Sequence, residues 1–301
     1  MTASSLPCRL ICASNLAYQV STNGPLTPSP LPDYAAGAGL IGKAVGFIDS
    51  LAVHACLVGT FQDGVFISFR GTLAIDDPNH SLQLRIRDWV NDFRARLVES
   101  PNIPGKVHEG FLDGLNSLWD GAKKEAERQL ALLGAGSKLF ITGHSKGGGI
   151  APLAAVRWFQ ETGTKPTTIT FEAPKVGNED FQSGVATAGL EIHRYEYQDD
   201  FVPHVPPSSR LLTMLQSFIG EDFSVLDDHN YQHVGHLHFI DSNNVIRTPT
   251  NVVEEFLLNS ERLTSIARLI LGKKLDQIIE DHRIGCGSGA MKIVCAGEVC
   301  K

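Results

Sequence analysis

Lys-Leu-Phe-Ile-Thr-Gly-His-Ser-Lys-Gly-Gly-Gly-Ile, residues 138–150, is the stretch that decides the fold of this chain. Its apolar first half, which ends at Thr142, predicts a strand, and the residues after Gly147 predict a helix. Gly143 and Gly147 flank Ser145 and lack a Cβ atom, so the strand and the helix can approach closely. This order of strand, sharp turn and helix exposes a serine hydroxyl and makes Ser145 a candidate nucleophile.

The surroundings of Ser145 give the pattern its weight. Gly-x-Ser-x-Gly by itself is a weak signal in a chain with 29 glycines. The strand before it and the small residues of the helix after it make the pattern persuasive; these are Ala151, Ala154 and Ala155. The positive end of that helix would lie close to the oxygen that becomes negative when a serine attacks a carbonyl.

Composition sets the limits. The 301 residues are 43% hydrophobic and 20% charged, which predicts one large globular domain over 1–301. A net charge of -7 without a basic run argues against a nucleic-acid partner. No apolar run reaches the ~18 residues of a membrane-spanning helix. The N-terminus lacks a basic segment, and Pro7 and Arg9 interrupt its apolar stretch. We therefore predict a cytoplasmic protein, with secretion as the alternative if a signal has been removed.

The cysteines leave two possibilities open. Their low density favours reduced thiols, but their concentration at the two ends of the chain also allows a disulfide that fastens the tail. No Cys-x-x-Cys motif occurs, so we predict no zinc ribbon. We also predict that the protein needs no metal and no cofactor. The six cysteines are Cys8, Cys12, Cys56, Cys286, Cys295 and Cys300.

Predicted strands and helices alternate along the chain. This order predicts an α/β fold with a mainly parallel sheet that is covered by helices on both faces. The tail at 285–301 has no clear period and is predicted to be irregular. Strands are predicted at 53–60, 65–69, 138–142, 167–171, 191–197 and 235–240, and helices at 8–20, 89–97, 110–133, 146–161, 180–188 and 252–282.

A serine nucleophile needs a base, and the base needs an acid to orient it. The predicted strand 191–197 runs into Asp199 and Asp200, at the sheet edge where Ser145 is expected. Either aspartate could be the acid, and an aspartate that only caps the loop is the alternative.

Several histidines follow Ser145, and the base has to come from among them. His282 is favoured because it comes after Asp281, at the end of a predicted helix. His236 and His238 alternate along one strand, but no acidic residue lies between them, so a metal pair is disfavoured. The candidates are His204, His229, His233, His236, His238 and His282.

Taken together, these segments resemble the class 3 lipase family of fungal and plant triacylglycerol lipases. The resemblance implies an α/β hydrolase fold, with Ser145 as nucleophile, Asp200 as acid and His282 as base. It also implies that Thr72 and the backbone N–H of Lys146 form the oxyanion hole. The matching segments are 13–18, 67–72, 107–112, 141–148 and 200–207, with 171–177 in addition.

The activity that this resemblance implies is hydrolysis of carboxylic esters, with triacylglycerol at a lipid–water interface as the expected substrate. Phospholipase A1 activity, or hydrolysis of feruloyl or other soluble esters by the same residues, is the alternative. A hydrolase-fold binding protein without catalysis is a remote one. Residues 73–87 begin directly after Thr72, mix apolar and polar side chains, and are predicted to form a lid over the site.

The sequence also departs from the family. Lys146 stands where an apolar or amide residue is usual and places a cation next to the expected oxyanion. The stretch 210–230 is long, which keeps His236 open as an alternative base. We predict structural roles for His144 and His204, and an ion-pair role for Arg70.

Overall fold

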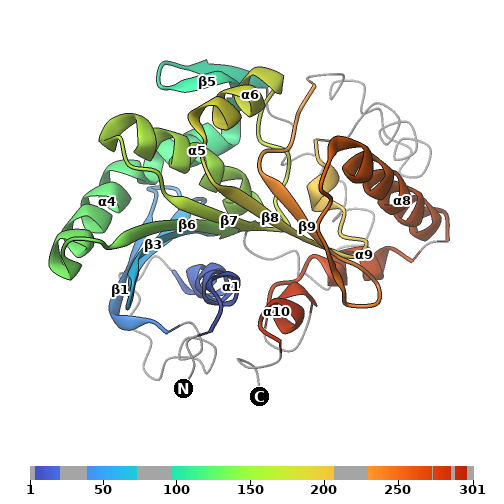
Figure 1. Cartoon of the computed structure of the whole chain (residues 1–301), viewed down its shortest axis with the longest axis horizontal. Coiled ribbons are helices and arrows are strands. Elements are labelled where there is room, and N and C mark those ends of the chain that lie inside the picture. Colours follow the sequence, from blue (N-terminus) through green and yellow to red (C-terminus); the bar gives the residue numbers. More distant parts are fainter. Residues whose placement is uncertain are drawn as a thin grey trace.

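The computed structural model describes residues 4–20, 39–72, 96–206, 230–272, 274–285 and 289–296. Figure 1 shows a central sheet with helices on both of its faces. Eight strands form this sheet in the order β1-β2-β3-β6-β7-β8-β9-β10. Their bounds are β1 Ile41–Ile48, β2 Ala55–Phe61, β3 Gly64–Phe69, β6 Lys138–His144, β7 Thr167–Phe171, β8 Ile192–Tyr197, β9 His236–Ile240 and β10 Ile246–Arg247.

The sheet is parallel where it carries the site. β3, β6, β7, β8 and β9 pair in parallel, whereas β1, β2 and β10 are antiparallel to their neighbours. The predicted α/β class with a mostly parallel sheet is thus confirmed. Parallel strands place their carboxyl ends at one edge of the sheet, and in such folds ligands bind at that edge.

Helices cover the two faces of the sheet and enclose two apolar cores. α4 (Glu109–Leu133), α5 (Lys146–Thr162) and α6 (Glu179–Ala188) lie on one face, while α1 (Leu6–Leu16) and α10 (Gly289–Val294) lie on the other (Figure 1). Neighbouring residues of one strand serve opposite cores: Ile67 and Ile141 pack with the first group, Phe66 and Phe140 with α1. This alternation follows from the period of two residues along a strand.

Two predictions in the first half of the chain need comment. The helix predicted at 89–97 is wrong at its end, because Leu97 opens a hairpin of β4 (Leu97–Ser100) and β5 (Ile103–His108). Arg96 is not helical either, and residues 89–95 and the predicted lid at 73–87 lie outside the described residues. β1 was not predicted, since Gly42 and Gly46 interrupt its apolar pattern.

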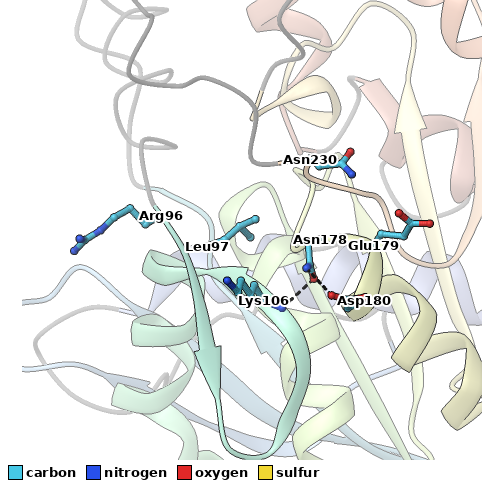
Figure 2. Close-up of a pocket in the computed structure, with 7 residues that line it drawn as sticks. All are labelled: Arg96, Leu97, Lys106, Asn178, Glu179, Asp180 and Asn230. Atoms are coloured by element: carbon cyan, nitrogen blue, oxygen red, sulfur yellow. Dashed lines mark hydrogen bonds between the residues drawn. The ribbon is translucent and has the colours of Figure 1, made fainter.

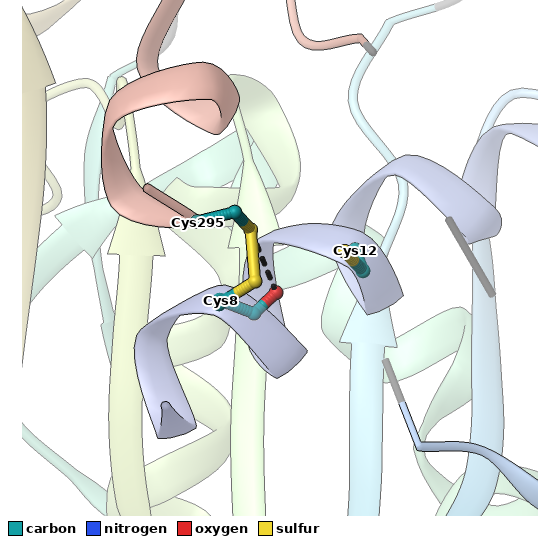
Figure 3. A group of neighbouring side chains, drawn as sticks. All are labelled: Cys8, Cys12 and Cys295. Atoms are coloured by element: carbon teal, nitrogen blue, oxygen red, sulfur yellow. Dashed lines mark hydrogen bonds between the residues drawn. A yellow bond between two sulfur atoms is a disulfide. The ribbon is translucent and has the colours of Figure 1, made fainter. Parts of the chain in front are cut away.

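The C-terminal segment is more ordered than the sequence predicts. α10 lies within the tail that was expected to be irregular, and a disulfide between Cys8 and Cys295 joins it to α1 (Figure 3). A disulfide at the tail is therefore present, and Cys12 and Cys56 are buried free thiols. The sulfur atoms of Cys8, Cys12 and Cys295 lie within 4.8 Å of one another. Two of the three are bonded together, so this cluster could offer three thiolates to a metal only after reduction.

The remaining helices lead the chain back to the sheet edge. α8 (Val252–Leu271) packs on β9 through Leu258, and α9 (Leu275–Asp281) follows it and ends at the residue before His282. Within the part of the chain that the structure describes, no helix combines the length and apolarity needed to cross a membrane.

Candidate active site

Ser145 occupies a sharp turn between β6 and α5. Its backbone has φ 58° and ψ -130°, a conformation that costs energy for any residue with a side chain. A Cβ atom on Gly143 would overlap the backbone of Gly147, and one on Gly147 would overlap the carbonyl of Phe69. Both glycines of the motif are therefore required by the close packing of strand, turn and helix.

Two hydrogen bonds connect Ser145 with a histidine and an aspartate. The Nε2 atom of His282 lies 2.9 Å from Oγ of Ser145, and Nδ1 of His282 lies 2.9 Å from Oδ2 of Asp200. Asp200 is held in turn by the backbone N–H of Val202, which donates to Oδ1 at 2.9 Å. The three side chains are buried. The structure thus brings together the serine, the acid and the histidine that the sequence singles out.

Burial sets the charge state of this group. It lowers the pKa of His282 to about 3, so the imidazole is neutral at neutral pH and can accept a proton. Burial also raises the pKa of Asp200, while the hydrogen bond from Val202 and the nearby Arg262 act in the opposite direction. A neutral imidazole between a hydroxyl and a carboxyl group is the arrangement that general-base catalysis requires.

The end of β3 packs directly against the serine turn. A Cβ atom on Gly71 would come within 3.1 Å of Cβ of Ser145, so Gly71 packs closely against the nucleophile. Thr72 is the next residue in the sequence. Lys146 is the first residue of α5, at the positive end of the helix dipole. Its side chain reaches Val53, because Nζ donates to that carbonyl at 3.2 Å.

The alternative residues that the structure describes lie elsewhere, and His229 lies outside the described residues. The backbone N–H of Asp199 donates to Oδ2 of Asp281, so Asp199 shares the loop but not the contact with His282. His236 opens β9, faces His193 and is exposed, at the strand end opposite the serine turn. His238 lies close by, with Nε2 2.9 Å from Nδ1 of His193.

The residues predicted to be structural are buried near the site. His204 lies in the short turn η2 (Val202–His204) after Asp200. Arg70 donates to the carbonyl oxygens of Val20 and Ala52, at 2.7 and 3.1 Å. The expected ion-pair role of Arg70 is corrected accordingly, since these hydrogen bonds go to carbonyls.

Ser145, His282 and Asp200 are called the triad below. Two residues near the triad are not recognised from the sequence as parts of the site. Tyr18 contacts His144 with its hydroxyl, and Glu172, which follows β7, is fully buried with φ 48°. The signal for Glu172 was a single carboxyl residue directly after an apolar strand. Tyr18 ends the segment 13–18 that resembles the family, but nothing in the sequence links its hydroxyl to His144.

A separate cavity lies between the β4–β5 hairpin and the start of α6 (Figure 2). It encloses about 550 Å³ and is lined mainly by polar and charged side chains. None of its lining residues belongs to the triad, so the cavity is distinct from the site around Ser145. The lining residues are Arg96, Leu97, Lys106, Asn178, Glu179, Asp180 and Asn230.

Comparison with known proteins shows what this chain is similar to. Residues 66–210 match the sequence profile described as lipase (class 3). Over this segment, slightly less than half of the sequence, the chain resembles the class 3 lipase family. The matched segment includes the serine turn and Asp200, and it ends before His282.

Similar proteins include a lipase of Rhizomucor miehei, which is 30% identical over 156 residues; these are 50% of this chain and 40% of that protein. A chloroplastic phospholipase A(1) of Arabidopsis thaliana is 32% identical over 160 residues, 47% of this chain and 33% of that protein. This chain therefore spans well under half the length of these relatives.

Solved structures agree on the fold. A triacylglycerol lipase whose catalytic centre is described as a serine protease triad superimposes with a TM-score of 0.63 at 24% identity. The match covers 81% of this chain and 83% of the other chain. At this identity the likeness establishes the α/β hydrolase fold.

Proposed function

We propose that this chain hydrolyses carboxylic esters of lipids through an acyl-enzyme on Ser145, with triacylglycerol as the substrate class. The observation that carries the proposal is the unbroken chain of contacts from Asp200 through His282 to Ser145, with 2.9 Å at each step. The named activities of the relatives, lipase and phospholipase A(1), support the same chemistry.

In this mechanism Oγ of Ser145 attacks the ester carbonyl while Nε2 of His282 takes the hydroxyl proton. The imidazolium that forms is stabilised by the carboxylate of Asp200, which also holds the ring in the orientation that points Nε2 at the serine. His282 then gives the proton to the leaving alcohol, and water hydrolyses the acyl-enzyme by the same route.

In this proposal the oxyanion is bound by the two segments that meet at Ser145. The backbone N–H of Lys146 lies at the N-terminus of α5, and Thr72 follows Gly71, which packs on the nucleophile. In this proposal both donate to the negative oxygen of the tetrahedral intermediate. Losing one such donor typically costs about 3 kcal/mol of transition-state stabilisation.

The substrate class is tested with a set of esters. We expect a fluorophosphonate probe to label the wild type and not Ser145→Ala, with Ser137→Ala as a control on a half-buried serine outside the site. Rates are then compared for p-nitrophenyl esters of increasing chain length, triolein and phosphatidylcholine. Higher turnover of triolein than of phosphatidylcholine supports the lipase assignment. The reverse order identifies a phospholipase A1, and turnover of short soluble esters alone identifies an esterase. Absence of labelling and of any hydrolysis overturns the proposed function.

A further inference from the structure

A second chain of hydrogen bonds runs behind the triad. The hydroxyl of Tyr18, in the short helix η1 (Ala17–Gln19), lies 2.7 Å from Nδ1 of His144. On the other side of the same ring, Nε2 of His144 lies 2.9 Å from the backbone oxygen of His282. The rings of His144 and His282 are 4.7 Å apart between centroids. The histidine that precedes the nucleophile therefore contacts the histidine that activates it.

The donors and acceptors of this chain fit together in one direction only. The backbone oxygen of His282 can only accept, so Nε2 of His144 carries the ring proton, and the hydroxyl of Tyr18 donates to Nδ1. A neutral imidazole that accepts at Nδ1 carries its proton on Nε2 and can donate to the His282 carbonyl. Burial and the neighbouring His282 hold the pKa of His144 well below its usual value, which keeps this ring neutral.

Both ends of this chain of hydrogen bonds lie next to the nucleophile. At one end Gly71 packs so tightly that a Cβ atom there would overlap the Tyr18 hydroxyl, and Thr72 comes next. At the other end is the residue whose ring contacts Oγ of Ser145. The chain therefore joins the segment proposed to hold the oxyanion to the residue proposed to act as the base.

We infer that Tyr18 and His144 are positioning residues that hold Thr72 and His282 in register around Ser145. The inference rests on the proposed function, because it assigns these two residues to the same reaction. A displacement of about 1 Å in a catalytic group can lower the rate about 10²-fold. Hydrogen bonds that fix the positions of Thr72 and His282 together therefore contribute to turnover, although Tyr18 and His144 do not contact the substrate.

Glu172 is the competing acceptor in this region. Its Oε2 atom lies 2.9 Å from Nε2 of His144, but neither of its carboxyl oxygens forms a hydrogen bond. Burial and the charges of Asp200, Asp281 and Glu196 raise the pKa of Glu172 well above its usual value. Because neither carboxyl oxygen accepts from Nε2, the carbonyl of His282 is the acceptor of the Nε2 proton.

The first test removes single atoms from the chain. Tyr18→Phe deletes the hydroxyl and keeps the ring, and we expect kcat on a short soluble ester to fall about 10-fold with little change in KM. Tyr195→Phe is the matched control, because Tyr195 lies on β8 and takes no part in the chain. Unchanged kcat in Tyr18→Phe, or an equal loss in Tyr195→Phe, overturns the inference.

The second test separates positioning from packing at His144. His144→Gln retains an N–H that can donate to the His282 carbonyl, whereas His144→Leu retains only volume. We expect the glutamine variant to keep clearly more activity than the leucine variant at equal thermal stability. Tyr18→Phe combined with His144→Leu should be no worse than His144→Leu alone, because both changes break one chain. Additive losses, or equal activity of the two His144 variants, contradict the inference.

A third measurement does not depend on turnover. In protein labelled with ¹⁵N at histidine, the ring signals are assigned with His144→Gln and His282→Ala. Tyr18→Phe should shift the signals of both His144 and His282, and Tyr195→Phe should shift neither. If the wild type shows no ester hydrolysis and no labelling, the proposed function fails. The spectrum still decides whether Tyr18, His144 and His282 are linked by hydrogen bonds. An unchanged His282 signal in Tyr18→Phe overturns the inference.

Discussion

Nε2 of His282 lies 2.9 Å from Oγ of Ser145, although 137 residues separate the two in sequence. The contact depends on α9, which delivers His282 to the carboxyl edge of the sheet, next to the loop that follows β8 and carries Asp200. Because all three side chains are buried, the site is assembled and largely shielded from water before a substrate binds.

The identity of the base can be decided by a pair of variants. His282→Ala should lower kcat by at least about 10³-fold, because the serine loses its proton acceptor. His236→Ala should retain near-normal turnover, since His236 is exposed and faces His193. The measurement is kcat on a soluble p-nitrophenyl ester, with labelling of Ser145 as a check. A dead His236→Ala and an active His282→Ala would assign the base to His236.

The acid is decided in the same way. Asp200→Asn should lower kcat on the order of 10⁴-fold, because an amide that donates to His282 favours the wrong tautomer of the imidazole. Asp199→Asn is the matched control one residue earlier, and its backbone bond to Asp281 does not involve the altered side chain. Equal losses in the two variants would argue against a specific role for Asp200.

The sequence predicts the residues of this site more completely than it predicts the strands of the fold. The turn at Ser145 is encoded locally, since Gly143 and Gly147 are both required by close packing. In contrast, β1 has glycines within its span, and β4 is a short edge strand, so neither has a clear period. The buried carboxyl of Glu172 and its neighbours could not be predicted, because their contacts join residues from distant parts of the chain.

The disulfide between Cys8 and Cys295 should stabilise the fold. It closes a loop with a sequence separation of 287 residues, for which the chain-entropy account sets an upper limit of about 6 kcal/mol. We expect dithiothreitol and Cys8→Ala each to lower Tm by several degrees. Cys12→Ala is the control, because it removes a buried thiol outside the bond, and its Tm should still fall on reduction. A Tm of the wild type that does not respond to reduction contradicts this prediction.

As pH falls, the loss of activity should begin only at unusually low pH. The base must be neutral to accept the serine proton, and burial lowers the pKa of His282 to about 3. As pH falls, kcat/KM on a short soluble ester should therefore persist well below pH 6.5, the ordinary value for histidine. The profile is measured over the range in which the fold is intact by circular dichroism. A fall in kcat/KM centred near pH 6.5 would show that burial does not keep His282 neutral.

Asp281 should make the fold less stable as pH rises. Burial raises its pKa from 3.8 to about 7, with the charges of Asp199 and Asp200 adding to the effect. Since its folded pKa is above the unfolded one, its contribution is most favourable below about pH 4 and is lost progressively up to about pH 7. Asp281→Asn cannot ionise and can still accept the hydrogen bond from Asp199.

We therefore expect Asp281→Asn to match the wild type near pH 4 and to exceed it above pH 7. After allowance for solvent screening, the gain should be on the order of 1 kcal/mol, or a Tm rise of ~2–4 °C. Thermal unfolding at the two pH values is the measurement. Glu280→Gln changes the neighbouring exposed carboxyl, which pairs with Arg283, and should show no such gain at high pH. If the difference between Asp281→Asn and the wild type is the same at both pH values, the Asp281 carboxyl does not titrate between them, and its burial is not the source of the pH dependence.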